Sequence, residues 1–249
     1  MIEIRPLTGI GEVRPGDDLP ALLSGALRSH PPAAGSVLVV TQKIVSKAQG
    51  RFVDLAQVVP SQEAQRLGAI TRKDPRLVEL VLCESTAVLR AVPDVLITRH
   101  RLGLVMANAG IDRSNLGEKS SDRVLLLPVD PDLSARHIRE RLQADFGCRI
   151  AVVISDSFGR PWRIGVVNVA IGAAGLPSLL DRRGQLDRDG RPLEVTQVAM
   201  ADMIASAAGL AAGEGDEGIP AVLLSGLVLD ETDLPAEVLV RPVAQDLFP

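Results

Sequence analysis

The sequence is poor in aromatic residues and in cysteine. Aromatic side chains make up only 2% of the 249 residues, and tyrosine is absent. The hydrophobic fraction of 46% therefore comes mainly from Ala, Val, Leu and Ile, which predicts an aliphatic core. The two cysteines, Cys83 and Cys148, are too few and too far apart for a metal cluster or for the disulfide framework of a small secreted protein. We therefore expect a cytoplasmic protein.

An excess of positive charge and long apolar runs are also missing. The formal net charge is -4 and the isoelectric point is near 5.5, which argues against a nucleic-acid-binding protein. No stretch approaches the roughly 20 uninterrupted apolar residues of a membrane-spanning helix. The segment from Met1 to Arg5 lacks the charged-then-apolar pattern of a signal peptide. We expect neither a nucleic-acid partner nor a membrane.

Several common nucleotide and catalytic motifs are absent. There is no Gly-x-x-x-x-Gly-Lys-Ser/Thr loop, so a P-loop NTPase is disfavoured. Gly9 and Gly11 lack the third glycine of a dinucleotide-binding turn. The three histidines, His30, His100 and His137, have no metal-binding spacing, and nothing suggests a Ser-His-Asp triad.

The hydrophobic pattern predicts strands and helices that alternate without a strict βαβ rhythm. This favours an α+β fold with mixed β-sheets and flanking helices, built over residues 1–249 as one catalytic unit or as two intimately packed subdomains. Asp132 or Ser134 would cap the helix predicted at 132–146. The pattern predicts strands at 2–5, 36–40, 95–98, 104–107, 124–127, 150–154 and 221–224, and helices at 18–29, 61–67, 75–85, 132–146 and 196–212.

Three acidic loops are expected to follow apolar elements, at 108–115, 155–160 and 213–218. Carboxylate and hydroxyl oxygens are the ligands that Mg²⁺ and Mn²⁺ prefer. The loops therefore supply candidate metal ligands, with Ser157 as a hydroxyl neighbour of the acids Asp112, Asp156 and Glu214. For any single acid beside Gly or Ser, a turn-forming role is the commoner explanation. The loop 213–218 also fits a helix end with a glycine cap and a solvated acidic turn.

Two lysines follow the buried strand at 36–40, in a chain that otherwise prefers arginine. Lys43 and Lys47 stand four residues apart, beside Gln42. A lysine is a compact cation suited to the terminal phosphates of a nucleotide, although an exposed lysine is commoner in general. A second basic segment, Arg160 to Arg163, contains Trp162, the only tryptophan. It would suit an anionic aromatic substrate, and core packing of the tryptophan is an equal alternative.

Five short motifs occur in a defined order and together resemble those of the coenzyme F420-0 γ-glutamyl ligase family. Each motif alone is weakly specific, but the ordered set is highly specific and covers almost the whole chain. The motifs are Leu7-Thr8-Gly9-Ile10, Ser46-Lys47-Ala48-Gln49-Gly50, Asn108-Ala109-Gly110-Ile111-Asp112, Ser155-Asp156-Ser157-Phe158-Gly159-Arg160, and Gly213-Glu214-Gly215 continuing to Gly218-Ile219-Pro220-Ala221.

The resemblance implies roles for individual residues. Two divalent ions, Mg²⁺ or Mn²⁺, would be held by Asp112, Asp156, Ser157 and Glu214, with K⁺ as a further candidate ion. Catalysis would depend on Asp112, Asp156 and Lys47. Family members often carry Ser-Thr where this chain has Gln42 and Lys43, and they vary at the positions of Asp216 and Glu217. GTP would contact Leu7, Thr8, Gly9, Ile10, Gln42, Lys43, Lys47, Asn115, Gly213 and Gly215.

The resemblance also implies the activity. The family joins L-glutamate to the terminal carboxylate of coenzyme F420-0, or of its dehydro form, with GTP as co-substrate and an acyl phosphate as intermediate. Further glutamates are added through γ-linkages. Members form a homodimer, and some actinobacterial relatives carry an additional C-terminal nitroreductase-like domain. Two alternatives stay open: a metal-dependent ligase for another carboxylate or amino acid, and a non-catalytic nucleotide-binding protein.

Overall fold

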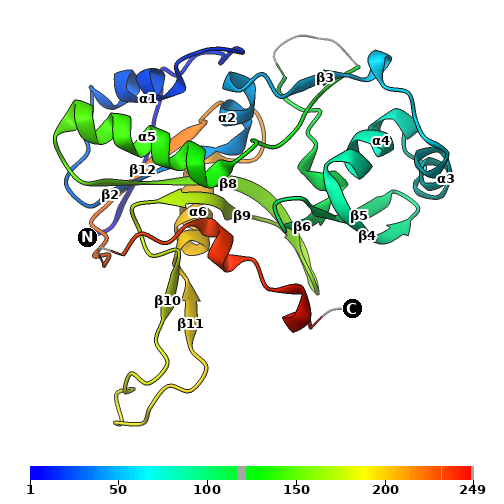
Figure 1. Ribbon diagram of the computed structural model, residues 1–249. Helices are drawn as coiled ribbons and strands as arrows, with labels where there is room; N and C mark the ends of the chain where they lie inside the picture. The colour runs from blue at the N-terminus through cyan, green and yellow to red at the C-terminus, as the bar shows by residue number, and fades with distance from the viewer. Residues whose placement is uncertain (117–121, 231, 248–249) are drawn as a thin grey trace.

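A five-stranded mixed sheet forms the centre of the molecule (Figure 1). The structure is a computed structural model that describes residues 1–116, 122–230 and 232–247. Strands β2 and β8 are parallel, and every other neighbouring pair is antiparallel. The predicted α+β fold with mixed sheets is confirmed. The strands lie in the order β1 (Glu3–Pro6), β12 (Ala221–Ser225), β2 (Ser36–Thr41), β8 (Ile150–Arg160) and β9 (Arg163–Ala174).

Helices cover both faces of this sheet. Successive side chains of a strand point to opposite faces, so Leu38 and Val40 of β2 pack on one side and Val37 and Val39 on the other. The first side is covered by α1 (Leu19–Leu27), α2 (Gln42–Ala48) and α5 (Pro131–Phe146), the second by α6 (Met200–Ala212) and the turn η3 (Ala236–Leu239). Both clusters consist almost entirely of aliphatic residues, as the composition predicted.

A smaller lobe lies to the right of the central sheet in Figure 1. Its own core brings together Leu67, Val78, Val81, Leu96 and Ala109. The pair β3–β7 and the turn η1 lie beside it, around Leu55 and Val124. The elements of the lobe are α3 (Gln62–Thr71), α4 (Pro75–Cys83), β4 (Ser85–Val92), β5 (Val95–His100), β6 (Val105–Ala107) and η2 (Asn108–Gly110), and those beside it are β3 (Phe52–Asp54), η1 (Leu55–Gln57) and β7 (Arg123–Leu125).

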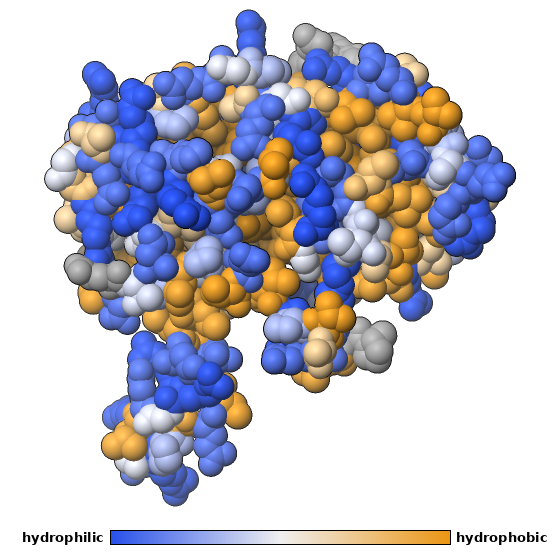
Figure 2. All heavy atoms as spheres, viewed as in Figure 1, coloured by the Kyte–Doolittle hydropathy of each residue, from blue (hydrophilic) through white to orange (hydrophobic). Residues whose placement is uncertain are grey.

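A hairpin projects from the body and is largely hydrophilic along its outer part (Figures 1 and 2). It is formed by β10 (Leu179–Asp181) and β11 (Gln197–Ala199). The predicted helix at 196–212 therefore begins only at Met200, because the residues before it pair with β10. The chain then returns under the sheet through η3 and ends near η4 (Val243–Gln245). No helix within the described ranges is long and apolar enough to span a membrane.

Two further expectations about local structure are wrong. The strand at 150–154 does not end before the acidic motif but continues to Arg160, because β9 pairs with it throughout. Asp130 caps α5 by accepting a 2.8 Å hydrogen bond from the Leu133 N–H group. Asp132 instead accepts from the backbone of Ala173, at 2.7 Å, and ties α5 to β9.

Candidate functional site

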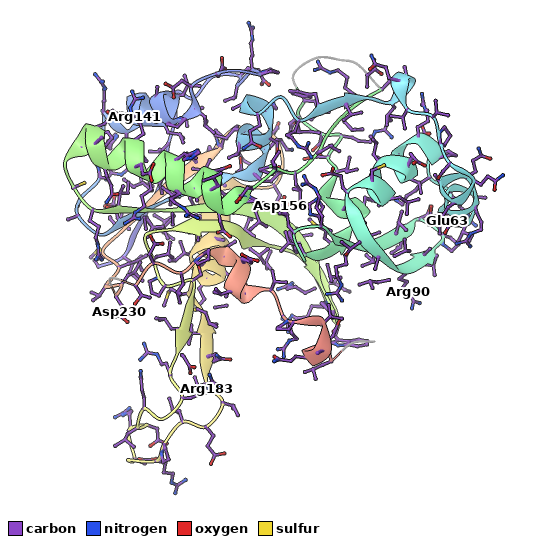
Figure 3. The ribbon with its side chains drawn as sticks, viewed as in Figure 1. Glu63, Arg90, Arg141, Asp156, Arg183 and Asp230 are labelled. Carbon is purple, nitrogen blue, oxygen red and sulfur yellow. The ribbon has the colours of Figure 1, made fainter. Side chains whose placement is uncertain are left out.

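The sheet topology brings distant segments of the chain to one edge. Because β2 and β8 are parallel, with Thr41 opposite Ser155, their continuations Gln42 and Asp156 emerge side by side. β12 is antiparallel to β2, so the glycine-rich segment before it lies at the same edge. β1 is antiparallel to β12, so the loop after β1 also arrives there. Figure 3 shows Asp156 near the middle of the molecule, where the central sheet meets the smaller lobe.

These segments line a cavity of about 630 Å³. Residues of the loop after β1, of α2, of the segment after η2, of β8 and β9, and of the glycine-rich segment all contribute to it. Most of the residues assigned to nucleotide or metal from the sequence are in the wall. Those in the wall are Ile10, Gln42, Lys43, Lys47, Asp112, Asn115, Asp156, Ser157, Gly213, Glu214 and Gly215.

The other residues assigned from the sequence lie outside this wall. Leu7 is buried in the hydrophobic core, and its N–H group extends the pairing with β12 by donating to Ala221 at 2.9 Å. Thr8 and Gly9 are exposed beside the cavity. Trp162 is 87% exposed at the turn between β8 and β9, so the alternative that it packs in the core is wrong.

Lys43 and Asp112 form an ion pair across the cavity wall. The Lys43 ammonium lies 2.7 Å from Asp112 Oδ2 and donates to the Ser114 carbonyl at 3.2 Å. The Ser114 N–H and hydroxyl groups both donate to Asp112 Oδ1 at 2.8 Å. Burial raises the pKa of Asp112, but the hydrogen bonds from Lys43 and Ser114 outweigh it and hold the pKa below its ordinary value. Asp112 is therefore ionised and oriented at neutral pH.

Asp156 has the opposite electrostatic character. Burial, together with the nearby negative charges of Asp112 and Glu214, raises its pKa to about 7. The Ser157 backbone N–H group and the positive charge of Lys43 oppose this shift and do not cancel it. Carboxylates that repel one another in this way form a region where a cation would relieve the repulsion.

Glu214 is held by a side chain of β9. Asn168 Nδ2 donates to Glu214 Oε1 at 2.7 Å. Gly209 of α6 lies directly behind Asn168, and a Cβ atom there would overlap the Asn168 amide. A glycine in the middle of a helix costs stability, so its presence here has a packing reason. The close approach of α6 places Asn168 against the acid.

Lys47 lies at the end of α2 and pairs with an acid from the N-terminal loop. Its side chain is only 6% exposed, and its ammonium group forms an ion pair with Glu12. In the same helix, Gln42 is buried and accepts a 3.0 Å hydrogen bond from the Ser46 hydroxyl. The helix thus presents one cation to Asp112 and a second to Glu12.

Two hydrogen bonds hold the glycine-rich segment, one from the segment after η2 and one within the loop itself. Asn115 Nδ2 donates to the Gly215 carbonyl at 3.3 Å and joins the segment after η2 to this loop. The Gly215 N–H group donates to Glu217 Oε2 at 2.8 Å. The segment from Gly213 to Gly218 is therefore an ordered part of the cavity wall.

The residues present fit a hard divalent cation by their chemistry. Asp112, Asp156, Ser157 and Glu214 offer carboxylate and hydroxyl oxygens around one cavity. Across the part of the chain that the structure describes, no three His, Cys, Asp or Glu side chains stand close enough together to enclose an ion. A bound Mg²⁺ usually takes one or two carboxylates and completes its shell with phosphate and water, which this arrangement allows. The metal roles of these residues stay predictions.

Sequence reasoning missed Glu12, Ser114 and Asn168. The only signal for Glu12 was its place after the glycine-containing loop Gly9–Gly11, and for Ser114 its place two residues after Asp112. Asn168 lies in a strand that was not predicted at all. Its contact with Glu214 depends on the packing of α6 against β9, which no local pattern reveals.

Comparison with known proteins agrees with this architecture. Residues 9–226 match the family model described as F420-0:Gamma-glutamyl ligase. A protein of Methanopyrus kandleri named coenzyme F420:L-glutamate ligase is 44% identical, over 99% of this chain and 97% of its own length. Proteins of the same name are 42% identical in Methanothermobacter thermautotrophicus, over 99% of this chain and 96% of the relative, and 45% identical in Natronomonas pharaonis, over 90% and 85%. The chain belongs to the F420-0:γ-glutamyl ligase family.

Proposed function

We propose that this protein is a GTP-dependent ligase that joins L-glutamate to the terminal carboxylate of coenzyme F420-0 or its dehydro form. One observation carries the proposal: in a chain of this ligase family, Lys43 and Lys47 line the same cavity as Asp112, Asp156 and Glu214. The lysines suit phosphate groups, and the acids suit the cations that accompany them.

The proposed metal site consists of Asp112, Asp156, Ser157 and Glu214. Two divalent ions, Mg²⁺ or Mn²⁺, would be held there, with K⁺ as a further candidate. When bound, the metal would offset the repulsion between the substrate carboxylate and the triphosphate. The raised pKa of Asp156 supports the proposal, since the nearby negative charges that contribute to it would be balanced by a cation.

The proposed reaction has two steps. A carboxylate oxygen of the acceptor bonds to the γ-phosphorus of GTP, the bond from that phosphorus to the bridging oxygen breaks, and GDP leaves. The α-amine of glutamate then attacks the carbonyl carbon of the acyl phosphate and loses a proton, while phosphate departs. The first step replaces a poor leaving group with a good one. Repetition on the γ-carboxyl of the added glutamate would extend the tail.

The chain contributes position and charge. Lys43 and Lys47 would neutralise phosphate oxygens, and Asn115, with the backbone of Gly213 and Gly215, would fix the nucleotide. Ile10, partly buried against the core, would support the nucleotide from the N-terminal loop. A cytoplasmic homodimer is part of the same proposal.

Incubation of the protein with GTP, Mn²⁺, L-glutamate and F420-0 tests the proposal. Mass spectrometry should detect the acceptor with one added glutamyl residue, and GDP and phosphate should form in equal amounts. Reactions that lack glutamate or contain the Asp156→Asn variant serve as controls. A product with a different amino acid would favour the alternative ligase. GTP binding without phosphate release when the acceptor is supplied would favour a non-catalytic protein.

A further inference from the structure

Two groups in the cavity that could meet an anionic ligand are occupied by carboxylates of the chain itself. Lys47, with its side chain only 6% exposed, is paired with Glu12, whose side chain is 53% exposed. The Gly215 N–H group is paired with Glu217. Both acids line the cavity, as do their partners.

Glu217 lies closely against the glycine-rich loop. A Cβ atom at Gly213 would overlap the Glu217 carboxyl group, and Gly213 also has a φ of +73°, which favours glycine. The loop is thus shaped around a carboxylate that accepts from its backbone. A backbone pocket of this kind accepts the oxygens of phosphates and carboxylates equally well.

Glu12 neutralises a cation that would be costly to bury alone. A nearly buried ammonium group needs a counter-ion, and Glu12 supplies it from an exposed loop between β1 and α1. Neither Glu12 nor Glu217 caps a helix, and neither lies in a strand. Glu12 accepts from Lys47, and Glu217 accepts from the Gly215 N–H group.

We propose that Glu12 and Glu217 are resident anions, whose carboxylates hold Lys47 and the Gly215 N–H group until anionic groups of the ligand replace them. They make the cavity selective for polyanions over singly charged anions. A singly charged anion gains one interaction for each that it breaks, whereas a triphosphate carries enough charge to displace both acids. This inference rests on the proposed function in that the cavity receives a triphosphate.

Calorimetric titration of the metal-free protein with inorganic tripolyphosphate tests the inference. Glu12→Gln and Glu217→Gln remove a charge and keep an oxygen acceptor of similar size. Asp216→Asn is the matched control, because Asp216 is in the same loop and lines the same cavity, and its side chain forms no hydrogen bond or ion pair with the residues that the structure describes. Both Gln variants should bind tripolyphosphate about threefold to tenfold more tightly than the wild type, and the control should change less than about twofold.

The same titrations with orthophosphate test the selectivity. The preference for tripolyphosphate over orthophosphate should fall in both Gln variants. An equal gain in tripolyphosphate affinity in Asp216→Asn would mean that the affinity depends only on the total negative charge of the cavity, and would overturn the inference. Weaker binding in the Gln variants, or no tripolyphosphate binding by any of the proteins, would also overturn it.

The glutamylation assay with F420-0 separates this inference from the proposed function. If the Gln variants gain affinity for tripolyphosphate as described but the wild type adds no glutamate, the resident anions stand and the proposed function fails. If the wild type adds glutamate but the affinities of the Gln variants do not change, the proposed function stands and the resident anions fail.

Discussion

Asn168 and Gly209 determine the position of the Glu214 carboxylate in the cavity. Glu214 follows α6, Asn168 lies in β9 and donates to it at 2.7 Å, and Gly209 allows α6 to approach Asn168. Gly209 lowers the stability of α6, since alanine is favoured over glycine by about 1 kcal/mol in a helix interior. Stability and function therefore oppose each other at this position.

Substitution of Gly209 by alanine should expose this conflict. The new methyl group would push the Asn168 amide away from Glu214, so kcat/KM should fall about tenfold or more, as for other groups that orient a metal ligand. The melting temperature should stay close to that of the wild type, because the gain in helix propensity offsets the strain.

Gly25→Ala is the matched control for this experiment. Gly25 is exposed within α1 and has no atom within 4 Å of its added Cβ position. This variant should gain stability and keep full activity. Unchanged activity in Gly209→Ala would contradict the role assigned to Asn168.

Asp156 should make the metal-free protein sensitive to pH. Its pKa is raised to about 7 in the folded protein from 3.8, so the folded state favours the protonated acid. This contribution to stability is fully present below about pH 4 and is lost as the pH rises through about 7. At pH 8 the Asp156→Asn variant, which cannot ionise, should be more stable than the wild type by up to about 4 kcal/mol.

The advantage of Asp156→Asn should shrink as the pH falls from 7 to 4. Urea unfolding in the presence of a chelator at several pH values measures it. The same variant should lose at least about a hundredfold in kcat, if Asp156 holds metal. A variant less stable than the wild type at pH 8 would contradict the electrostatic description of Asp156.

At the scale of elements, an ionic cluster ties the smaller lobe to the chain that leaves α2. Glu84, at the end of α4, lies 2.8 Å from Arg51 and 3.2 Å from Arg101. His100 Nδ1 accepts from the Leu102 N–H group at 3.0 Å, and its Nε2 faces Glu84 Oε2 at 3.5 Å. Burial raises the pKa of Glu84, but His100 and the two arginines more than offset it and hold the pKa at about 2.

Glu84→Gln should therefore destabilise the fold at neutral pH. The depressed pKa means that Glu84 stabilises the folded state above about pH 4.5 and that this contribution is lost as the pH falls toward about 2. The expected loss is about 2–3 kcal/mol at pH 7, since the side chain is only 13% exposed. The difference from the wild type should shrink as the pH falls from about 4.5 toward 3.

Glu63→Gln is the control, because it removes an exposed ion pair with Arg66 on α3. It should leave the free energy of unfolding unchanged. Chemical denaturation from pH 3 to pH 7 compares both variants with the wild type. An equal, pH-independent loss in both would refute a specific role for Glu84.

The elements that could be predicted from the sequence are those whose pattern is complete within a few residues. The runs at 37–40, 150–154 and 221–224 are uninterruptedly apolar, and each lies in a strand of the central sheet. The extension of β8 through Asp156 is polar, so no local pattern predicts it as a strand. Its strand geometry comes from pairing with β9, which was not predicted either. The hairpin β10–β11 was also missed, because each of its strands is defined by pairing with the other.

At the scale of the whole molecule, the site is assembled from nearly the entire chain. The cavity wall begins at Ile10 and ends at Pro220, and the elements between them meet only through the sheet order. Most of the site residues that residue types and motif order predicted lie in this wall. Partners such as Glu12 and Asn168 could not be predicted, because tertiary packing alone brings them to Lys47 and Glu214.

The central claim is that acids far apart in the sequence hold divalent cations against a triphosphate. Anomalous diffraction from a crystal grown with Mn²⁺ and a non-hydrolysable GTP analogue tests it most directly. We expect manganese peaks at about 2.0–2.3 Å from oxygens of Asp112, Asp156 and Glu214, with phosphate oxygens completing the coordination of the same ions. Manganese bound elsewhere, with these three side chains directed into solvent, would contradict it.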